Sequence, residues 1–267
     1  MSIRKMAVAG AFYPADPNEI KKMFEYYNEI LDKHLKDKSI LKIAPQAIIV
    51  PHAGYIYSAF TANVAFRALK NSNPEKIVVI GPSHKVYLKG ASISLQDEFE
   101  TPFGNLNIDN SLTSKIKEKF GLSFIPEAHK EHSTEVQMPF IKYYMPQAKV
   151  VEIIYGKISP YELEKVIAYV LQERDSAVVI SSDLSHYYNL EKANAIDSVC
   201  IEAVSKLDTN LINQGCEACG ILGIEAIMLF AKENGLKSVL LDYRTSADAS
   251  GDKSAVVGYM SAGFVQR

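Results

Sequence analysis

Short apolar runs rich in β-branched residues alternate with segments of helical periodicity along most of the chain. Four of these runs have the length of a buried strand: residues 47–50, 76–80, 150–155 and 177–180. Between them, apolar residues recur every three or four positions, as on the buried face of a helix. Strands joined by helices predict an α/β fold, an αβα sandwich with a largely parallel or mixed central sheet and helices on both faces.

Capping residues indicate where several helices begin. Asp16 precedes Pro17 and Glu19, a pattern that predicts an N-cap, a first helical residue and a capping-box partner. The same logic opens a helix at residues 159–162. Ser58 is predicted to cap the helix that follows the first buried strand.

Two segments depart from this alternation. Residues 90–108 alternate apolar and polar positions around a Thr-Pro-Phe-Gly turn at 101–104, which predicts an antiparallel hairpin excursion. A single helix is expected over residues 133–144, although Pro139 lies inside it. The chain has no internal repeat, low-complexity tract or flexible linker, so residues 1–267 are expected to form a single domain.

Composition limits the classes of function. The 267 residues are 48% hydrophobic and carry a formal net charge of −2, which argues against a surface for nucleic acid or anionic membranes. No apolar stretch approaches the ~20 residues of a membrane span, and the N-terminus is too short in apolar residues for a signal peptide. Three cysteines, Cys200, Cys216 and Cys219, are too few and too clustered for a disulfide framework, so a cytoplasmic location is expected.

Polar side chains follow several of the predicted strands. His52, His84 and the pair Asp183 and His186 come directly after buried runs, and the polar loop 244–253 follows a later strand. Ligands in such sheets bind beyond the carboxyl ends of the strands, where these residues are expected to converge. One histidine after a strand is more often structural, but three at one edge favour a metal site. Neutral imidazoles with a carboxylate suit Fe(II), Zn(II) or Cu(II).

Four residues near this edge have both a functional and a structural interpretation. Asp183 would orient a histidine, or only cap the segment after its strand. His186 would be a metal ligand or a general acid/base. His132 and Glu135 lie one turn apart on a predicted helix and face the same side. Glu135 could equally be a helix-start carboxylate favoured by the macrodipole.

Other motifs give weaker signals. Cys216-x-x-Cys219 fits a redox pair or half of a zinc site, but no second pair is present. Small buried residues at a helix start explain it better. The chain has no G-x-S-x-G elbow and no glycine pattern for nucleotides, so serine hydrolysis and nucleotide binding have little support.

Several motifs, in order along the chain, resemble the Memo family, called AmmeMemoRadiSam system protein B in prokaryotes. The resemblance runs from residue 8 to the last strand and implies an αβα architecture similar to class III extradiol ring-cleaving dioxygenases. The motifs are A-G-A-F-Y-P (9–14), P-H-A-G-Y (51–55), G-P-S-H (81–84), T-P-F-G (101–104), E-H-S-T-E (131–135), S-D-L-S-H (182–186) and C-G (219–220).

The resemblance also implies roles for single residues. Class III enzymes bind Fe(II) through two histidines and a glutamate, and a further histidine acts as acid and base. By motif, His52 and His84 match the two ligand histidines, and His186 matches the acid/base position. In animal Memo proteins a cysteine of the late loop is the third ligand. Here Ala249 stands at that place, and the adjacent Asp248 is the expected replacement.

Two functions are compatible with these features. The first is a metal-dependent oxidoreductase of dioxygenase-like type, with Fe(II) favoured over Zn or Cu. In it His186 moves protons, Asp183, His132 and Glu135 surround the site, and Asp252 is the alternative third ligand. The second is a non-catalytic adaptor that holds a peptide or partner protein in the same cleft. Because prokaryotic members are often encoded with a radical-SAM protein and an AMMECR-type protein, those are the expected partners.

Overall fold

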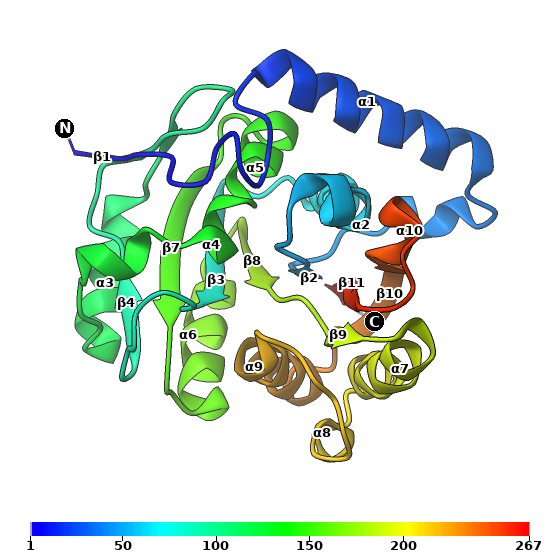
Figure 1. Ribbon diagram of the computed structural model, residues 1–267. Helices are drawn as coiled ribbons and strands as arrows, with labels where there is room; N and C mark the ends of the chain where they lie inside the picture. Colours follow the sequence, from blue (N-terminus) through cyan, green and yellow to red (C-terminus); the bar gives the residue numbers. More distant parts are fainter. Residues whose placement is uncertain (1, 267) are drawn as a thin grey trace.

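A twisted sheet forms the centre of the molecule, drawn in Figure 1 as a computed structural model whose described part is residues 2–266. The strands are β1 (Ile3–Arg4), β2 (Ala47–Val50), β3 (Lys76–Pro82), β4 (Ala91–Ile93), β5 (Glu98–Phe99), β6 (Leu106–Asn107), β7 (Lys149–Tyr155), β8 (Ser176–Ser181), β9 (His186–Tyr188), β10 (Lys237–Thr245) and β11 (Val256–Val265). The large sheet has the order β10-β11-β2-β8-β3-β7-β4, with β9 paired to β11. A small sheet contains β1, β5 and β6.

Helices cover both faces of the large sheet. They are α1 (Pro17–His34), α2 (Tyr55–Leu69), α3 (Asn110–Phe120), α4 (His132–Glu135), α5 (Met138–Tyr144), α6 (Pro160–Gln172), α7 (Leu190–Lys206), α8 (Thr209–Ile212), α9 (Ile221–Glu233) and α10 (Ala247–Ser250), with 3-10 turns η1 (Lys38–Leu41), η2 (Lys70–Ser72) and η3 (Pro126–His129). The apolar faces of α1, α2 and α5 form one core with the sheet, and those of α3, α6, α7 and α9 form the other. This confirms the predicted αβα sandwich. Within residues 2–266, no helix has the length and apolar character needed to cross a membrane.

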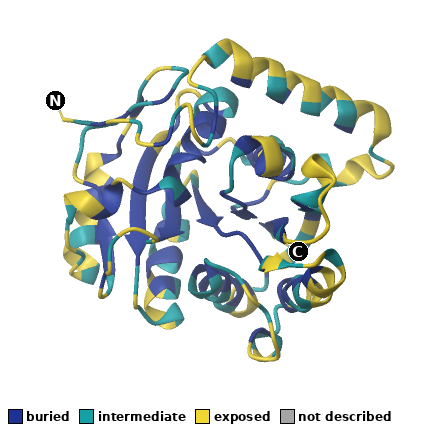
Figure 2. Cartoon of the chain, viewed as in Figure 1, coloured by how far each residue is buried: buried dark blue, intermediate teal, exposed yellow. Residues whose placement is uncertain are grey.

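The central strands are buried on both faces, which explains their continuous apolar sequences. In β2, Ile48 and Val50 contribute to the core with α1, α2 and α5, whereas Ile49 contributes to the opposite core. All three side chains are fully buried. Figure 2 shows the same burial across the middle of the sheet, with most exposed residues on the outer faces of the helices and in the loops.

The direction of the strands places the carboxyl ends of several of them at the same edge of the sheet. Strands β2, β8 and β3 are neighbours and run parallel, so their carboxyl ends lie at one edge. Strand β10 is antiparallel to β11, which is antiparallel to β2, so β10 ends at this edge too. The loops after these strands are therefore held side by side, as the strand pattern predicted.

The predicted hairpin excursion exists in a modified form. Strands β5 and β6 pair antiparallel across the 101–104 turn. Strand β4, by contrast, is the antiparallel edge of the large sheet beside β7 and is not an arm of the hairpin. The alternation does not identify the sheet, because β4 alternates in sequence although all three of its residues are buried.

Helix boundaries confirm some caps and correct others. Asp16 caps α1, and Ser159 forms a full capping box with Glu162 at α6. Helix α2, however, begins at Tyr55 after Gly54, and the Ser58 hydroxyl donates to the Ala53 carbonyl inside the first turn. The expected start at Ser58 was therefore wrong by one turn, because a serine hydroxyl can also satisfy a carbonyl within a helix.

The single helix expected over residues 133–144 is also wrong. It is divided into α4 and α5, and Pro139 lies in the first turn of α5. Proline lacks an N–H and fixes its φ angle, so a helix tolerates it at its start and not in its interior. The break gives α4 its own direction at the edge of the sheet.

Candidate metal centre and cavity

Three histidines from distant segments meet at the carboxyl edge of the sheet. His52 follows β2, His84 follows β3, and His132 is the first residue of α4. One ring nitrogen of each lies within 4.8 Å of those of the other two. Their ring centroids are 5.1 Å (His52–His84), 5.4 Å (His52–His132) and 4.7 Å (His84–His132) apart. Sequence patterns placed His132 around the site, whereas the structure places it within the cluster.

A fully buried carboxylate, Glu131, holds two of these rings. Its Oε1 lies 2.7 Å from Nδ1 of His132 and 3.3 Å from Nδ1 of His84, and its Oε2 accepts from the His84 amide at 2.7 Å. Burial opposes ionisation of Glu131, but hydrogen bonds from His132 and His84 outweigh it and lower the pKa of this carboxyl far below its usual range. An ionised carboxylate only accepts, so these contacts favour a proton on each Nδ1 and leave each Nε2 with a free lone pair.

Ser181 orients the third imidazole. Its Oγ lies 2.9 Å from Nδ1 of His52 and donates its own proton to the Ser133 carbonyl, so Nδ1 of His52 must be the donor. Gln137 donates a second hydrogen bond to the same Oγ. Burial, with the neighbouring His84 and His132, lowers the pKa of His52 well below its usual value. The ring is therefore neutral, with Nε2 available as a metal ligand.

A free thiol lies against that nitrogen. Sγ of Cys219 is 3.1 Å from Nε2 of His52 and accepts a hydrogen bond from the Asp183 amide at 3.2 Å. Burial, and then the Asp183 carboxylate, raise the pKa of Cys219 to about 12. Gly220 permits this approach, since a Cβ there would come within 2.6 Å of Cβ of Ser182. Cys219 is thus a partly buried thiol just before α9 that also touches the histidine cluster.

The other two cysteines are bonded to each other. Cys200 of α7 and Cys216, in the loop before α9, form a disulfide. The spacing of the cysteines had predicted no disulfide. Three cysteines in the sequence do not reveal that α7 and this loop pack together, which is what makes the pairing geometrically accessible.

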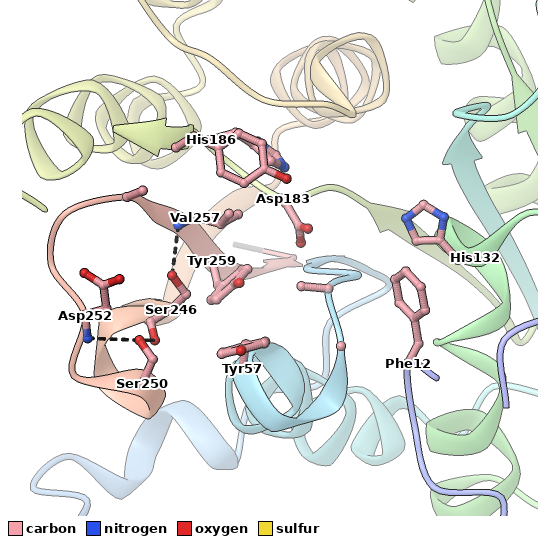
Figure 3. A pocket seen from close by; sticks show the side chains of 14 residues that line it. Phe12, Tyr57, His132, Asp183, His186, Ser246, Ser250, Asp252, Val257 and Tyr259 are labelled. Atoms are coloured by element: carbon pink, nitrogen blue, oxygen red, sulfur yellow. Dashed lines mark hydrogen bonds between the residues drawn. The ribbon is translucent and has the colours of Figure 1, made fainter. Parts of the chain in front are cut away.

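A cavity of about 480 Å³ opens beside the cluster (Figure 3). His132 forms one side of it, and Asp183 and His186 contribute from the segment after β8. The Asp183 carboxylate points into the cavity in Figure 3, while its Oδ1 accepts from the His52 amide at 2.7 Å. Asp183 is only 4% exposed, and this burial raises the pKa of its carboxyl. Tyr187, next to His186, has φ of 63° and is 77% exposed at the cavity mouth.

A second buried carboxylate supports the Asp183–His186 segment from behind. Oδ1 of Asp197 accepts from the Ser185 amide at 3.0 Å, and Oδ2 accepts from the Tyr243 hydroxyl at 2.7 Å. Gly258 makes room for it, because a Cβ there would lie 1.9 Å from Oδ2. Helix α7 therefore fixes the backbone that presents His186.

The late loop does not bring Asp248 to the histidines. Strand β10 continues to Thr245, and Oδ2 of Asp248 accepts from the Thr245 amide at 2.8 Å at the start of α10. Asp248 lines a neighbouring cavity with Tyr243 and Arg244. The Asp248 carboxylate is thus held by the backbone at the end of β10, and this bond competes with metal ligation. Asp252, the alternative ligand, lines the large cavity on the side opposite His132 in Figure 3.

Glu135 faces the N-terminal segment rather than the imidazoles. It pairs with Arg4, accepts from the amides of Ala7 and Val8, and accepts from the Tyr13 hydroxyl at 2.7 Å. The sequence had placed Glu135 on the same side as His132. Helix α4 is a single turn, and its two ends serve different neighbours.

The N-terminal segment that Glu135 holds forms a wall of the cavity. The ring of Phe12 lies 4.6 Å from that of His132, centroid to centroid, and the Phe12 carbonyl accepts from the Tyr55 amide at 2.7 Å. Phe12 also lines the cavity. The N-terminal A-G-A-F-Y-P motif thus contributes directly to the site.

Sequence reasoning missed two contributors, Glu131 and Cys219. Glu131 immediately precedes His132 within the E-H-S-T-E motif, and a carboxylate beside a candidate ligand histidine was the available signal. Cys219 was considered only as half of a C-x-x-C pair and in the C-G motif; its contact with His52, 167 residues away in sequence, could not be read from either pattern.

Comparison with known proteins agrees with the motifs. The family model described as "Memo-like protein" matches residues 4–263. A MEMO1 family protein of Aquifex aeolicus is 36% identical over 280 residues, covering 99% of this chain and 100% of that protein. A MEMO1 family protein of Desulfurococcus amylolyticus is 34% identical over 282 residues, covering 99% of both. A third, from Sulfolobus acidocaldarius, is 34% identical over 281 residues, covering 98% of this chain and 99% of the relative. The chain belongs to the Memo family.

Proposed function

We propose that His52, His84 and His132 bind one divalent metal ion through their Nε2 atoms. The observation that carries the proposal is the clustering of three imidazoles, each with its Nδ1 engaged by a buried acceptor. Such outer partners orient ligand histidines and raise their basicity. In this proposal His132 takes the place for which the sequence alone favoured Asp248.

The donor set fits a borderline transition metal. Three neutral imidazoles suit Fe(II), Zn(II) or Cu(II), whereas Mg²⁺ and Ca²⁺ prefer oxygen ligands. Fe(II) is the favoured ion because of the resemblance to non-haem iron dioxygenases. Cys219 lies close enough to His52 to influence the choice, since its Sγ is 3.1 Å from Nε2. When bound, such a metal supplies Lewis-acid or one-electron chemistry.

The residues around the cavity would act on the ligand. His186 lines the cavity and can accept or donate a proton on a ligand oxygen as a general acid/base. Asp183 fixes the backbone before the first ligand histidine by accepting from the His52 amide. Phe12 packs on His132 and keeps water from one side of the ring. Together these features favour a metal-dependent oxidoreductase acting on a small molecule.

Metal analysis of protein purified anaerobically tests this proposal. We expect stoichiometric metal in the wild type, and its loss in His52→Ala, His84→Ala and His132→Ala. His34→Ala is the matched control, because His34 ends α1 on the surface. Equal metal content in all five proteins would exclude the site.

A second function rests on the mouth of the cavity. Tyr57 and Tyr187 are 38% and 77% exposed there, more than large apolar side chains usually are. The alternative proposal is an adaptor that holds a peptide or protein, such as a radical-SAM or AMMECR-type partner in the cytoplasm. Pull-down with a radical-SAM protein discriminates the two, because only adaptor binding would survive His52→Ala and His84→Ala.

A further inference from the structure

The cavity beside the histidines lacks fixed positive charge. Among the described residues that line it, none is a lysine or an arginine, while Asp183 and Asp252 contribute two carboxylates. Lys253, although next in sequence to Asp252, lines a neighbouring cavity with Leu190 and Asn194 instead. Arg244 stacks on a ring outside the cavity. The fixed side-chain charges around the cavity are therefore negative.

The cavity is also lined by aromatic rings. Phe12, Tyr57, Tyr187 and Tyr259 all contribute to its surface. The face of an aromatic ring attracts a cation, and the attraction grows when the cation is removed from water. Rings combined with carboxylates are the usual means by which proteins recognise ammonium groups.

One tyrosine of the cavity has an unpaired hydroxyl. Tyr259 is 1% exposed as a whole residue, and no hydrogen bond within residues 2–266 includes its hydroxyl, whose oxygen is not among the fully buried side-chain atoms. Figure 3 shows Tyr259 between Asp183 and the loop that carries Ser246. Burial, and then the Asp183 carboxylate, raise the pKa of Tyr259, so the hydroxyl is neutral and its oxygen can accept a hydrogen bond. An unpaired hydroxyl on a residue that lines a cavity can bind a polar ligand there.

The two ends of the cavity differ. In Figure 3 His132 lies on one side, and Ser246, Ser250 and Asp252 lie on the other, with Tyr57 and Tyr259 between them. Asp252 is exposed at this end of the cavity; its Oδ1 accepts from Ser254, and its Oδ2 is open to solvent and to a ligand. A cation at this end would be separated from a metal ion at the histidines.

We propose that the cavity binds a small molecule carrying a protonated amine, with the ammonium group at the Asp252 end against Tyr57 and Tyr259. This proposal deepens the proposed function. It rests on that function only for the statement that a metal lies at the histidine end of the cavity. The volume of about 480 Å³ suits a ligand of this size.

Three small phenols that differ only in the charge of their side chain test the proposal. The side chain is positive in tyramine, neutral in 4-ethylphenol and negative in 4-hydroxyphenylacetate. Calorimetric titration of metal-stripped protein should give tyramine an affinity about ten-fold above that of 4-ethylphenol, with the acid weakest. Asp252→Asn and Tyr259→Phe should each reduce tyramine binding and leave 4-ethylphenol unchanged. Glu191→Gln, an exposed carboxylate outside this cavity, is the control.

The outcomes separate this proposal from the metal site. Equal or stronger binding of the acid, no measurable binding of tyramine, or tyramine binding unaffected by Asp252→Asn and Tyr259→Phe would each overturn it. Metal content measured on the same preparations is independent of these titrations. Amine preference without metal uptake would refute the metal site alone, and metal uptake without amine preference would refute the ligand class alone.

Discussion

Glu131 determines the geometry of two of the three imidazoles. Its side chain is fully buried and contacts Nδ1 of both His84 and His132, while its oxygens also accept from the amides of those residues. A metal site depends on such partners because they fix both the ring orientation and the nitrogen that carries the proton. Among residues that are not themselves ligands, Glu131 should therefore have the largest effect on metal affinity when it is replaced.

Replacement of this carboxylate tests its role. We expect Glu131→Gln to weaken metal affinity about 10- to 100-fold, because an amide offers one acceptor where the carboxylate offers two. Competition with a chromogenic chelator measures the affinity. Glu127→Gln, at an exposed position of η3, is the control. Unchanged affinity in Glu131→Gln would show that the rings are held by other contacts.

A second buried pair predicts how stability depends on pH. Oε2 of Glu152 lies 2.7 Å from Nδ1 of His129, and both side chains are buried. Burial alone would raise the pKa of Glu152, but the charge of His129 and its hydrogen bond outweigh burial and lower it. A carboxyl whose pKa is lower in the folded state contributes stability above its unfolded pKa of about 4.3, and this contribution is lost as pH falls through the folded value.

The free energy of unfolding should therefore fall as pH drops below about 4.3, and Glu152→Gln should flatten this dependence. At neutral pH the free energy of unfolding of Glu152→Gln should be about 2–3 kcal/mol lower than that of the wild type, because His129 loses a charged partner. Urea unfolding of metal-free protein at several pH values gives both quantities. A parallel pH dependence in the two proteins would contradict this assignment.

At the scale of elements, a buried carboxylate ties the N-terminal segment to α4. Glu135 binds Arg4, the amides of Ala7 and Val8, and Tyr13, and the segment so held places Phe12 on His132. The chain before α1 has little regular structure of its own. Its position at the cavity therefore depends on these contacts.

Loss of this tether should free the segment locally. We expect Glu135→Gln to raise hydrogen exchange of the Ala7 and Val8 amides by about ten-fold or more, because it removes the charge that pairs with buried Arg4. Glu100→Gln is the matched control, since Glu100 binds Lys5 and the Met6 amide of the same segment from a more exposed position. Equal exchange in the two variants would contradict a special role for Glu135.

Elements with strong periodicity were predictable, and their junctions were not. The central strands and the convergence of His52, His84 and His186 followed from apolar runs and from parallel pairing. The position of Asp248 did not follow, because a loop aspartate can cap a helix start or bind a metal, and sequence does not distinguish the two. The different surroundings of His132 and Glu135 were equally hidden, since Glu135 is drawn to Arg4, Ala7 and Val8, which are distant in sequence.

At the scale of the whole molecule, the sheet concentrates the chemistry at one edge. Neighbouring parallel strands β2, β8 and β3 end together, and α4 adds His132 from a separate segment. The Memo relatives match over nearly the whole chain, so this arrangement belongs to the complete fold and not to an inserted module. The central claim is that this edge holds a metal through three histidines.

Anomalous diffraction from crystals grown anaerobically with Fe(II) tests that claim most directly. We predict a single iron peak within bonding distance of Nε2 of His52, His84 and His132. Iron bound instead by Asp248 or Asp252, or no peak at the three imidazoles, would contradict it.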